Sequence, residues 1–167
     1  RAIANALERK TLEREKRVIE DELKDSVHFG KIVGNSARMQ HIYEMIRQVA
    51  RTRSSILITG ESGTGKELIA KAIHEQSDRV DQPFVTINCG GIPETLLESE
   101  FFGHRKGSFT GASADKKGLM EIAHKGTLFM DEIGELPFGI QGKLLGFLER
   151  REYLRVGGQY PQRSHCR

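Results

Sequence analysis

The chain has 167 residues, of which 37% are hydrophobic and 29% are charged, and its formal net charge is +3. This length allows one domain with a hydrophobic core, and the composition is typical of a globular protein. No apolar run approaches the ~20 residues of a membrane span, and no signal-peptide segment is present, so we expect a cytoplasmic protein. The two cysteines, Cys89 and Cys166, are far apart and argue against a disulfide framework.

Residues 2–25 have a helix-forming composition with interleaved opposite charges and no Gly or Pro. We interpret them as a solvated linker helix. Leu12, Ile19 and Leu23 leave open a short coiled-coil seam, although the heptads are not sustained.

The remaining elements alternate in type along the chain. Ser36 is a suitable N-cap for a helix over residues 37–50. Apolar periodicity then predicts three strands, over residues 54–60, 83–89 and 127–130. It also predicts two helices, over residues 66–77 and 138–154. Strands that alternate with helices favour an α/β layer fold with a mostly parallel sheet.

A phosphate-binding loop is the strongest motif. It lies between a predicted strand and a predicted helix, and its residues are Gly60, Glu61, Ser62, Gly63, Thr64, Gly65, Lys66 and Glu67. Glycines let backbone N–H groups approach phosphate oxygens, and the helix N-terminus adds partial positive charge. Lys66 reaches the β- and γ-phosphates. Glu67 replaces the Ser or Thr that usually contacts Mg²⁺, but its carboxylate is also a hard oxygen ligand.

Two carboxylates follow the third predicted strand. Asp131 and Glu132 end the apolar run Thr127 to Met130. We predict that Asp131 holds Mg²⁺ through water and that Glu132 polarises the attacking water as a general base. Solvated acids at a strand-to-turn transition are the alternative, and the nearby phosphate loop favours the catalytic interpretation.

Three stretches, GESGTGKELIAKAIHEQSDR, NCGGIPETLLESEFFGHRKGSFTGA and GTLFMDEIGELP, resemble the AAA+ domain of sigma-54-dependent transcriptional activators of the NtrC and NifA type. The resemblance implies a three-layer P-loop NTPase that binds ATP and Mg²⁺ and forms a homo-oligomeric, hexameric ring. It also implies that the intact protein hydrolyses ATP to remodel sigma-54 RNA polymerase holoenzyme, and it implies no membrane contact. The family usually carries Glu after the lysine, which matches Glu67.

The resemblance also assigns residues. Asn88 would hold Glu132 until the partner engages, and Ile32 and Val33 would line the adenine pocket. The sigma-54 contact would be the loop of Gly107, Ser108, Phe109, Thr110, Gly111 and Ala112. In this loop Ser108 replaces the family's usual alanine. We expect Phe101 and Phe102 to anchor the loop base in the core, and His104 to be a solvated or loop histidine instead of a metal ligand.

The resemblance divides the chain into three segments. Residues 1–29 would be a linker helix, with similarity to the end of a GAF-type sensor, and 30–158 a partial AAA+ domain. Residues 159–167 would be a tail that does not match. The sensor motifs, arginine fingers, lid and DNA-binding domain are not found in this sequence, so we expect a truncated, nearly inactive ATPase. DNA would be bound only through the missing C-terminal domain. Two alternatives stay open, namely another AAA+ remodelling ATPase and a non-catalytic sigma-binding module.

Overall fold

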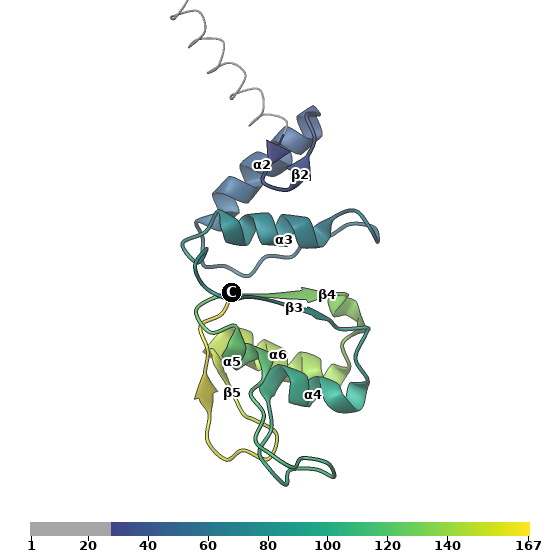
Figure 1. Ribbon diagram of the computed structural model, residues 1–167, viewed down its shortest axis with the longest axis vertical. Helices are drawn as coiled ribbons and strands as arrows, with labels where there is room; N and C mark the ends of the chain where they lie inside the picture. Colours follow the sequence, from purple (N-terminus) through teal and green to yellow (C-terminus); the bar gives the residue numbers. More distant parts are fainter. Residues whose placement is uncertain (1–27) are drawn as a thin grey trace, which may run out of the picture.

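A computed structural model describes residues 28–167 (Figure 1). The helix expected over residues 2–25 and its coiled-coil alternative lie outside the described residues. In chain order the described elements are β1 (His28–Phe29), β2 (Ile32–Val33), α2 (Ala37–Ala50), α3 (Lys66–Glu75), β3 (Phe84–Asn88), α4 (Glu94–Phe102), α5 (Leu119–Ile122), β4 (Thr127–Asp131), the 3₁₀ helix η1 (Ile133–Glu135), α6 (Phe138–Arg150), β5 (Glu152–Tyr153) and β6 (Gln162–Arg163).

The elements form three layers around the parallel pair of β3 and β4 (Figure 1). Helices α2 and α3 lie on one side of this pair, and α4, α5 and α6 lie on the other. The register places Phe84 opposite Thr127 and Asn88 opposite Asp131. Because parallel strands end at the same edge of a sheet, the polar residues that end β3 and β4 meet there.

Two apolar clusters form the core, one against the sheet and one between α2 and α3. The first joins β3 and β4 to α4, α5 and α6 and includes the fully buried Phe101, Phe102 and Met120. The second joins α2 to α3 around Tyr43 and Ile46. Burial of side chains of this size is worth roughly 2–3 kcal/mol each, so the first cluster holds α4, α5 and α6 to the sheet and the second holds α2 to α3.

A buried polar contact links α3 to β4. His74, only 5% exposed, lies 2.9 Å from the Thr127 hydroxyl through its Nδ1 atom and packs against the Phe84 ring. The pKa of His74 is lowered, mainly because burial removes the ring from water. The side chain is therefore held in its neutral form, which can share a hydrogen bond with a neutral hydroxyl.

The helix predicted over residues 37–50 is confirmed. Ser36 caps it, and the Ser36 hydroxyl accepts a hydrogen bond from the Met39 N–H at 3.3 Å. Helix α6 is also present, but it ends at Arg150, before the predicted end at residue 154, and β5 follows. Ile140, Leu144 and Phe147 are buried, whereas Leu145 is 58% exposed.

The strand predicted over residues 54–60 is not formed. Ile56 and Leu57 are exposed, and a cavity of about 290 Å³, lined largely by apolar side chains, separates this segment from β4. A strand forms only beside a neighbour that accepts its backbone hydrogen bonds. In the described residues, the β4 edge bonds instead to Arg167, which donates to Gly126 at 3.0 Å and accepts from Leu128 at 2.8 Å.

The Arg167 side chain closes the C-terminal end of α2. Its guanidinium donates to the carbonyl oxygens of Val49, Ala50 and Ser54. The last carbonyl groups of a helix have no hydrogen-bond partner within the helix, and the Arg167 guanidinium supplies one. Because the Arg167 backbone bonds to the β4 edge, this contact connects α2 to the sheet. No helix within residues 28–167 combines the length and the apolar character that crossing a membrane demands.

Candidate functional site

A cavity of about 540 Å³ opens between the loop before α3 and the carboxyl end of β4. It is lined by Gly60, Ser62, Gly63, Gly65, Lys66, Glu67, Leu68, Asp131 and Glu132. The structure therefore brings the predicted phosphate loop and the two predicted strand-end carboxylates to one place, although they are about 65 residues apart in the sequence.

The loop backbone has the conformation that its glycines were expected to allow. Gly63 and Gly65 have φ angles of 76° and 88°, in the left-handed region. Helix α3 begins at Lys66, and its N-cap residue Gly65 makes no side-chain hydrogen bond. The first N–H groups of α3 therefore keep their partial positive charge for an anion.

Lys66 closes the loop from inside. Its ammonium donates to the carbonyl oxygens of Gly60 at 3.2 Å and Glu61 at 2.8 Å, and the Thr64 hydroxyl donates to Glu61 at 2.8 Å. These hydrogen bonds hold the Lys66 ammonium over the loop that is expected to bind phosphate. An incoming phosphate would compete with two neutral carbonyls for the ammonium, and a charge-assisted bond is the stronger one.

Asp131 and Glu132 form the acidic wall of the cavity. The Asp131 carboxylate accepts a hydrogen bond from the Glu132 N–H at 3.0 Å. Glu132 has φ 52° and ψ 43°, a left-handed conformation that costs an ordinary residue about 1–2 kcal/mol. Strain of this kind persists where the surrounding structure fixes it, as at functional sites. Here the turn follows β4 directly and sets the direction of the Glu132 side chain.

Asn88 lies beside this wall at the end of β3. Its side-chain oxygen accepts from the Gly91 N–H at 2.9 Å. A Cβ built on Gly90 would lie 2.7 Å from Glu132 Oε2 and 3.5 Å from Asn88 Oδ1, so both side chains approach this glycine. Within residues 28–167 Asn88 makes no hydrogen bond to Glu132. The holding role expected for Asn88 stays a prediction.

Cys89 lies behind the acidic wall. It is 1% exposed, and its N–H donates to the Asp131 carbonyl at 3.0 Å. Burial, with the negative charges of Asp131 and Glu132, raises the pKa of the thiol to about 11. The thiol therefore stays protonated and packs as a small apolar group.

The two residues expected at the adenine do not line this cavity. Ile32 is buried in the apolar cluster of α2 and α3, and Val33 is 66% exposed. Within residues 28–167 no group of three or more His, Cys, Asp or Glu side chains could hold a metal ion. In proteins Mg²⁺ is usually held by one or two carboxylates together with phosphate oxygens and water.

The hexapeptide loop, residues 107–112, closes on itself. The Gly107 N–H donates to the Ala112 carbonyl at 2.8 Å, and the Ala112 N–H donates to the Phe109 carbonyl at 3.0 Å. Gly107 and Gly111 have φ angles of 80° and 103°. Thr110 is exposed and Ala112 is buried. The loop is a compact turn whose tip faces solvent, and Phe101 and Phe102 anchor its base in the core as expected.

Two residues brace this loop. His104 lies in the loop after α4, which was one of the two expectations, but it is not solvated: it is 9% exposed and bonds through Nδ1 to the Ser99 hydroxyl at 2.7 Å. The His104 ring meets the Phe109 ring edge-on, with centroids 4.9 Å apart. Ser108, next to Phe109, packs against Gly157: a Cβ built on Gly157 would lie 2.6 Å from the Ser108 Cβ. The sequence analysis predicted neither the His104–Phe109 contact nor the Ser108–Gly157 contact, because both join residues of loops, where apolar periodicity is absent.

Residues 32–167 match the family described as the sigma-54 interaction domain. The chain is 51% identical over 153 residues to a Nif-specific regulatory protein of Herbaspirillum seropedicae, covering 92% of this chain and 28% of that protein. It is 48% identical over 156 residues to the regulatory protein AtoC of Escherichia coli (strain K12), covering 93% of this chain and 34% of AtoC.

Among solved structures the chain resembles NtrX from Brucella abortus in complex with ATP. The TM-score is 0.75 at 38% identity, over 96% of this chain and 35% of that one. The predicted α/β fold class is confirmed. The chain spans about a third or less of the relatives that it matches. The match runs to Arg167 and includes residues 159–167, and the predicted division into three segments stays a prediction.

Proposed function

The chain belongs to the sigma-54 interaction domain family, and on this premise we propose that it binds ATP with Mg²⁺ in the cavity between the phosphate loop and β4. One observation carries the proposal. A glycine loop, an uncapped helix N-terminus and a lysine face the same cavity as two strand-end carboxylates. This donor set fits the phosphates and the metal of a Mg²⁺–nucleoside triphosphate.

The residues divide the work by charge. The N–H groups of the loop and of the first turn of α3 cradle phosphate oxygens, and Lys66 adds a positive charge near the β- and γ-phosphates. Asp131, with Glu67 as a second carboxylate at the cavity, serves Mg²⁺ through water. Glu132 accepts a proton from the attacking water, and Asn88 orients the Glu132 carboxylate. Bound Mg²⁺–ATP supplies the phosphoryl group and a metal charge that balances the phosphates.

The hexapeptide loop would serve the partner. We propose that Phe109 and Thr110 contact sigma-54 in the RNA polymerase holoenzyme, and that the intact protein, assembled as a ring, uses ATP hydrolysis to remodel it. The exposed tip and the braced base support this role, because a contact residue must be exposed while its position is controlled.

The test is Glu132→Gln in the full-length protein. We expect ATP binding to be retained and hydrolysis to fall by about 10²–10⁴-fold, since the amide cannot accept the proton. Binding is followed by titration with a fluorescent ATP analogue and hydrolysis by phosphate release, over a range of protein concentrations that reports ring assembly.

Glu135→Gln is the matched control, because Glu135 is an exposed carboxylate three residues away that does not line the cavity. Both activities should survive this change. Hydrolysis at the unmodified rate by Glu132→Gln would exclude Glu132 as the base.

A further inference from the structure

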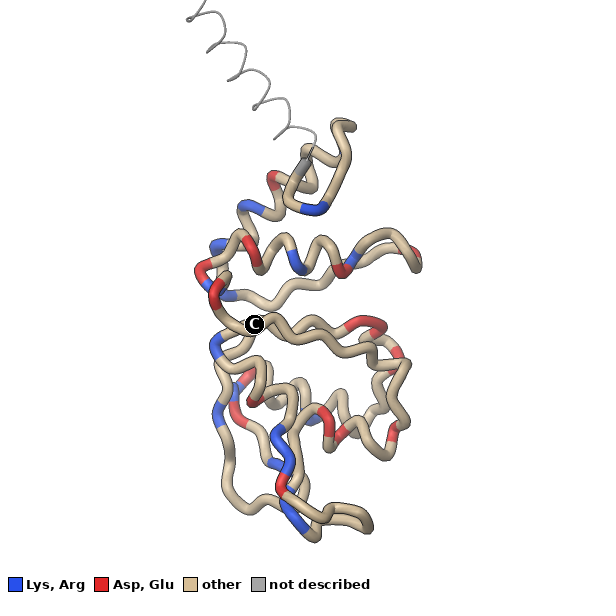
Figure 2. Tube along the Cα trace, viewed as in Figure 1, with Lys and Arg blue, Asp and Glu red and all other residues tan. Residues whose placement is uncertain are grey.

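The base of the hexapeptide loop, where the chain enters and leaves it, is tied to the body of the protein by several bonds. The His104 N–H donates to the Lys116 carbonyl at 3.0 Å, and the Lys116 N–H donates to the His104 carbonyl at 2.9 Å. The Arg105 N–H donates to the Val156 carbonyl at 3.0 Å, and the Arg105 side chain pairs with Asp115 at 2.5 Å. Figure 2 shows charged residues gathered at this base, whereas the loop itself carries no charge. The base is therefore held firmly in place.

Two glycines flank the loop tip, which is formed by residues 108–110. Beyond its chain neighbours, a Cβ built on Gly107 or Gly111 would meet no atom of the described residues within 4 Å. Their φ angles, of 80° and 103°, lie where glycine is at ease and other residues are strained. Because the backbone of a glycine rotates with little steric resistance, these two positions allow the tip to pivot on its fixed base.

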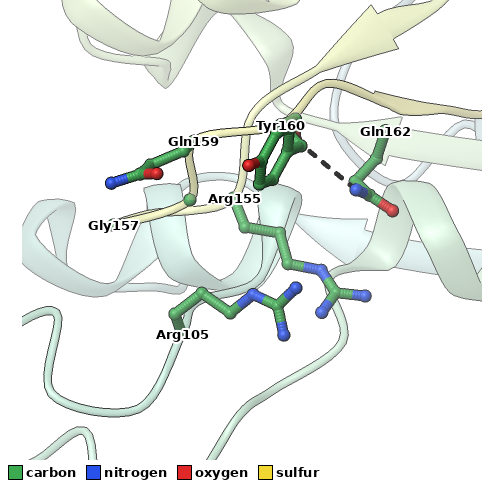
Figure 3. Close-up of a pocket in the computed structure, with 7 residues that line it drawn as sticks. Arg105, Arg155, Gly157, Gln159, Tyr160 and Gln162 are labelled. Carbon is green, nitrogen blue, oxygen red and sulfur yellow. Dashed lines mark hydrogen bonds between the residues drawn. The ribbon is translucent and has the colours of Figure 1, made fainter.

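Two side chains dock the tip on the body of the protein. The Phe109 ring meets the buried His104 ring edge-on, with centroids 4.9 Å apart, and Phe109 is 40% exposed. Ser108 packs against Gly157, where an added Cβ would lie 2.6 Å from the Ser108 Cβ. Figure 3 shows Gly157 in the segment that connects β5 to β6, near Arg105 of the base. In the docked position the protein itself thus covers more than half of Phe109.

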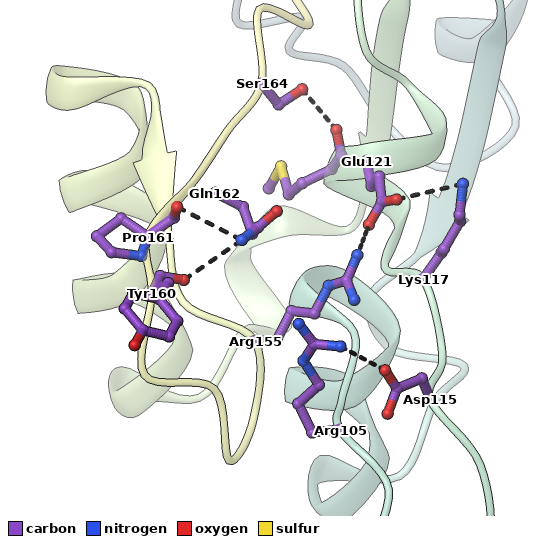
Figure 4. Close-up of polar contacts among 10 residues, drawn as sticks. Arg105, Asp115, Lys117, Glu121, Arg155, Tyr160, Pro161, Gln162 and Ser164 are labelled. Atoms are coloured by element: carbon purple, nitrogen blue, oxygen red, sulfur yellow. Dashed lines mark hydrogen bonds and ion pairs between the residues drawn. The ribbon is translucent and has the colours of Figure 1, made fainter.

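The Ser108 hydroxyl is buried in the docked position without a hydrogen-bond partner. Within residues 28–167 one other buried side-chain nitrogen or oxygen lacks a partner, and it is Nε of Arg155. Arg155 precedes Gly157 in the same segment, and its guanidinium pairs at its far end with Glu121 at 2.5 Å (Figure 4). The two unpaired atoms therefore belong to the two segments that meet when the tip docks. A buried hydroxyl without a partner is costly, whereas alanine, the residue usual in this family, would fill the position without this cost.

We propose that Ser108 is a positioning residue for Phe109. Its unpaired hydroxyl weakens the docked position, so the tip leaves His104 and Gly157 more readily than a tip with alanine would. Release gives the hydroxyl water as a partner and uncovers the Phe109 ring, while the base stays in place. The consequence for the partner rests on the proposed contact of Phe109 with sigma-54, whereas the release itself does not.

The release is measured by ¹⁹F NMR on the full chain with para-fluorophenylalanine in place of Phe109. The docked and the released ring have different surroundings, so we expect two exchanging resonances, and saturation transfer between them gives the released population. Ser108→Ala should lower this population by about 5- to 100-fold, since it removes an unpaired buried hydroxyl. Ser113→Ala is the matched control, because Ser113 is exposed beside the same loop, and it should change the population by less than about twofold.

His104→Gln should give a change of the opposite sign. Glutamine keeps a polar group for the Ser99 hydroxyl but lacks the aromatic ring, so the released population should rise by about 2- to 10-fold. A substitution that merely loosened the fold would raise the released population in every variant. The decrease expected for Ser108→Ala therefore separates the effect of the hydroxyl from a general loss of packing.

The consequence for the partner is measured in the full-length protein as capture of sigma-54. A partner that binds one of two states binds in proportion to the population of that state. Ser108→Ala should therefore weaken capture by the same factor by which it lowers the released population. If Phe109→Ala captured sigma-54 normally, the proposed function would fail, and the NMR measurement would still decide whether Ser108 controls the release.

Three results would overturn the proposal. The first is a single resonance without exchange, both in the chain that carries Ser108 and His104 and in His104→Gln. The second is a released population in Ser108→Ala that equals or exceeds that of the chain with Ser108, which would show that the hydroxyl has a partner in the docked position. The third is unchanged capture by Ser108→Ala although its released population has fallen.

Discussion

The two glycine-rich loops of this protein are closed in different ways. The phosphate loop is closed by a charge, because the Lys66 ammonium bonds to two backbone carbonyls at the mouth of an open cavity. The hexapeptide loop is closed by its own backbone and braced by the buried side chain of His104. A ligand can displace the first closure by offering a stronger acceptor, whereas the second changes only if the packing at its base changes.

This difference separates the two functions that we propose. Groups for phosphate chemistry belong on the first loop, since the carboxylates of β4 lie opposite it. The second loop carries no acid or base within residues 107–112 and presents one aromatic ring. It is suited to contact instead of catalysis. The predictions below change one loop at a time and are ordered by the size of the expected effect.

The largest effect is expected at the phosphate loop. Lys66→Ala should weaken ATP binding by about 3–5 kcal/mol, because charge-assisted bonds to two phosphates are lost. Isothermal titration of the full-length protein with ATP measures the change. Lys71→Ala, on the same helix but outside the cavity, should bind ATP normally. Similar losses in both variants would show that the charge of α3, and not the position of Lys66, determines affinity.

A smaller effect is expected at the base of the hexapeptide loop. Gly103 has φ 74°, and a Cβ there would lie 2.4 Å from the Lys116 carbonyl oxygen. Gly103→Ala should destabilise the fold by about 2–4 kcal/mol through overlap and backbone strain, as measured by urea unfolding.

Gly142→Ala is the control for Gly103→Ala. A Cβ at Gly142 meets nothing within 4 Å, in the middle of α6, so this change should stabilise the protein by up to about 1 kcal/mol. If Gly103→Ala unfolded at the same urea concentration as the unmodified protein, the loop base would be less tightly packed than the structure shows.

The smallest effect is a dependence of stability on pH. Because burial lowers the pKa of His74, the unfolded chain binds a proton first as the pH falls from the ordinary value of 6.5. The stability due to neutral His74 is therefore complete above pH 6.5 and is lost as the pH falls toward the folded-state pKa.

Urea unfolding of His74→Gln at about pH 7.5 and about pH 5.5 should show a smaller loss on acidification than the unmodified protein. The exposed His41→Gln should behave like the unmodified protein. An unchanged loss in His74→Gln would assign the pH dependence to other groups.

Local patterns predicted the elements that depend on local interactions. Ser36 capped its helix as expected, and Asn88 and Asp131 met because the parallel strands that they end share an edge. Residues 54–60 have the composition of a strand but depend on a neighbour that no local pattern specifies. The burial of His104 and the approach of Arg105 to Arg155 arise only when distant segments pack together, so no spacing in the sequence indicated them.

The separation of the two loops is the central claim, and Phe109→Ala in the full-length protein tests it most directly. ATP affinity and capture of sigma-54 in the presence of a transition-state analogue of ATP are measured on the same preparation. Thr110→Ala is measured in parallel, and Phe138→Ala, at a 91% exposed phenylalanine on α6, is the control. We predict unchanged ATP affinity and loss of capture in the two loop variants, and normal behaviour of the control. Normal capture by Phe109→Ala, or an equal loss of ATP affinity and capture, would contradict the account.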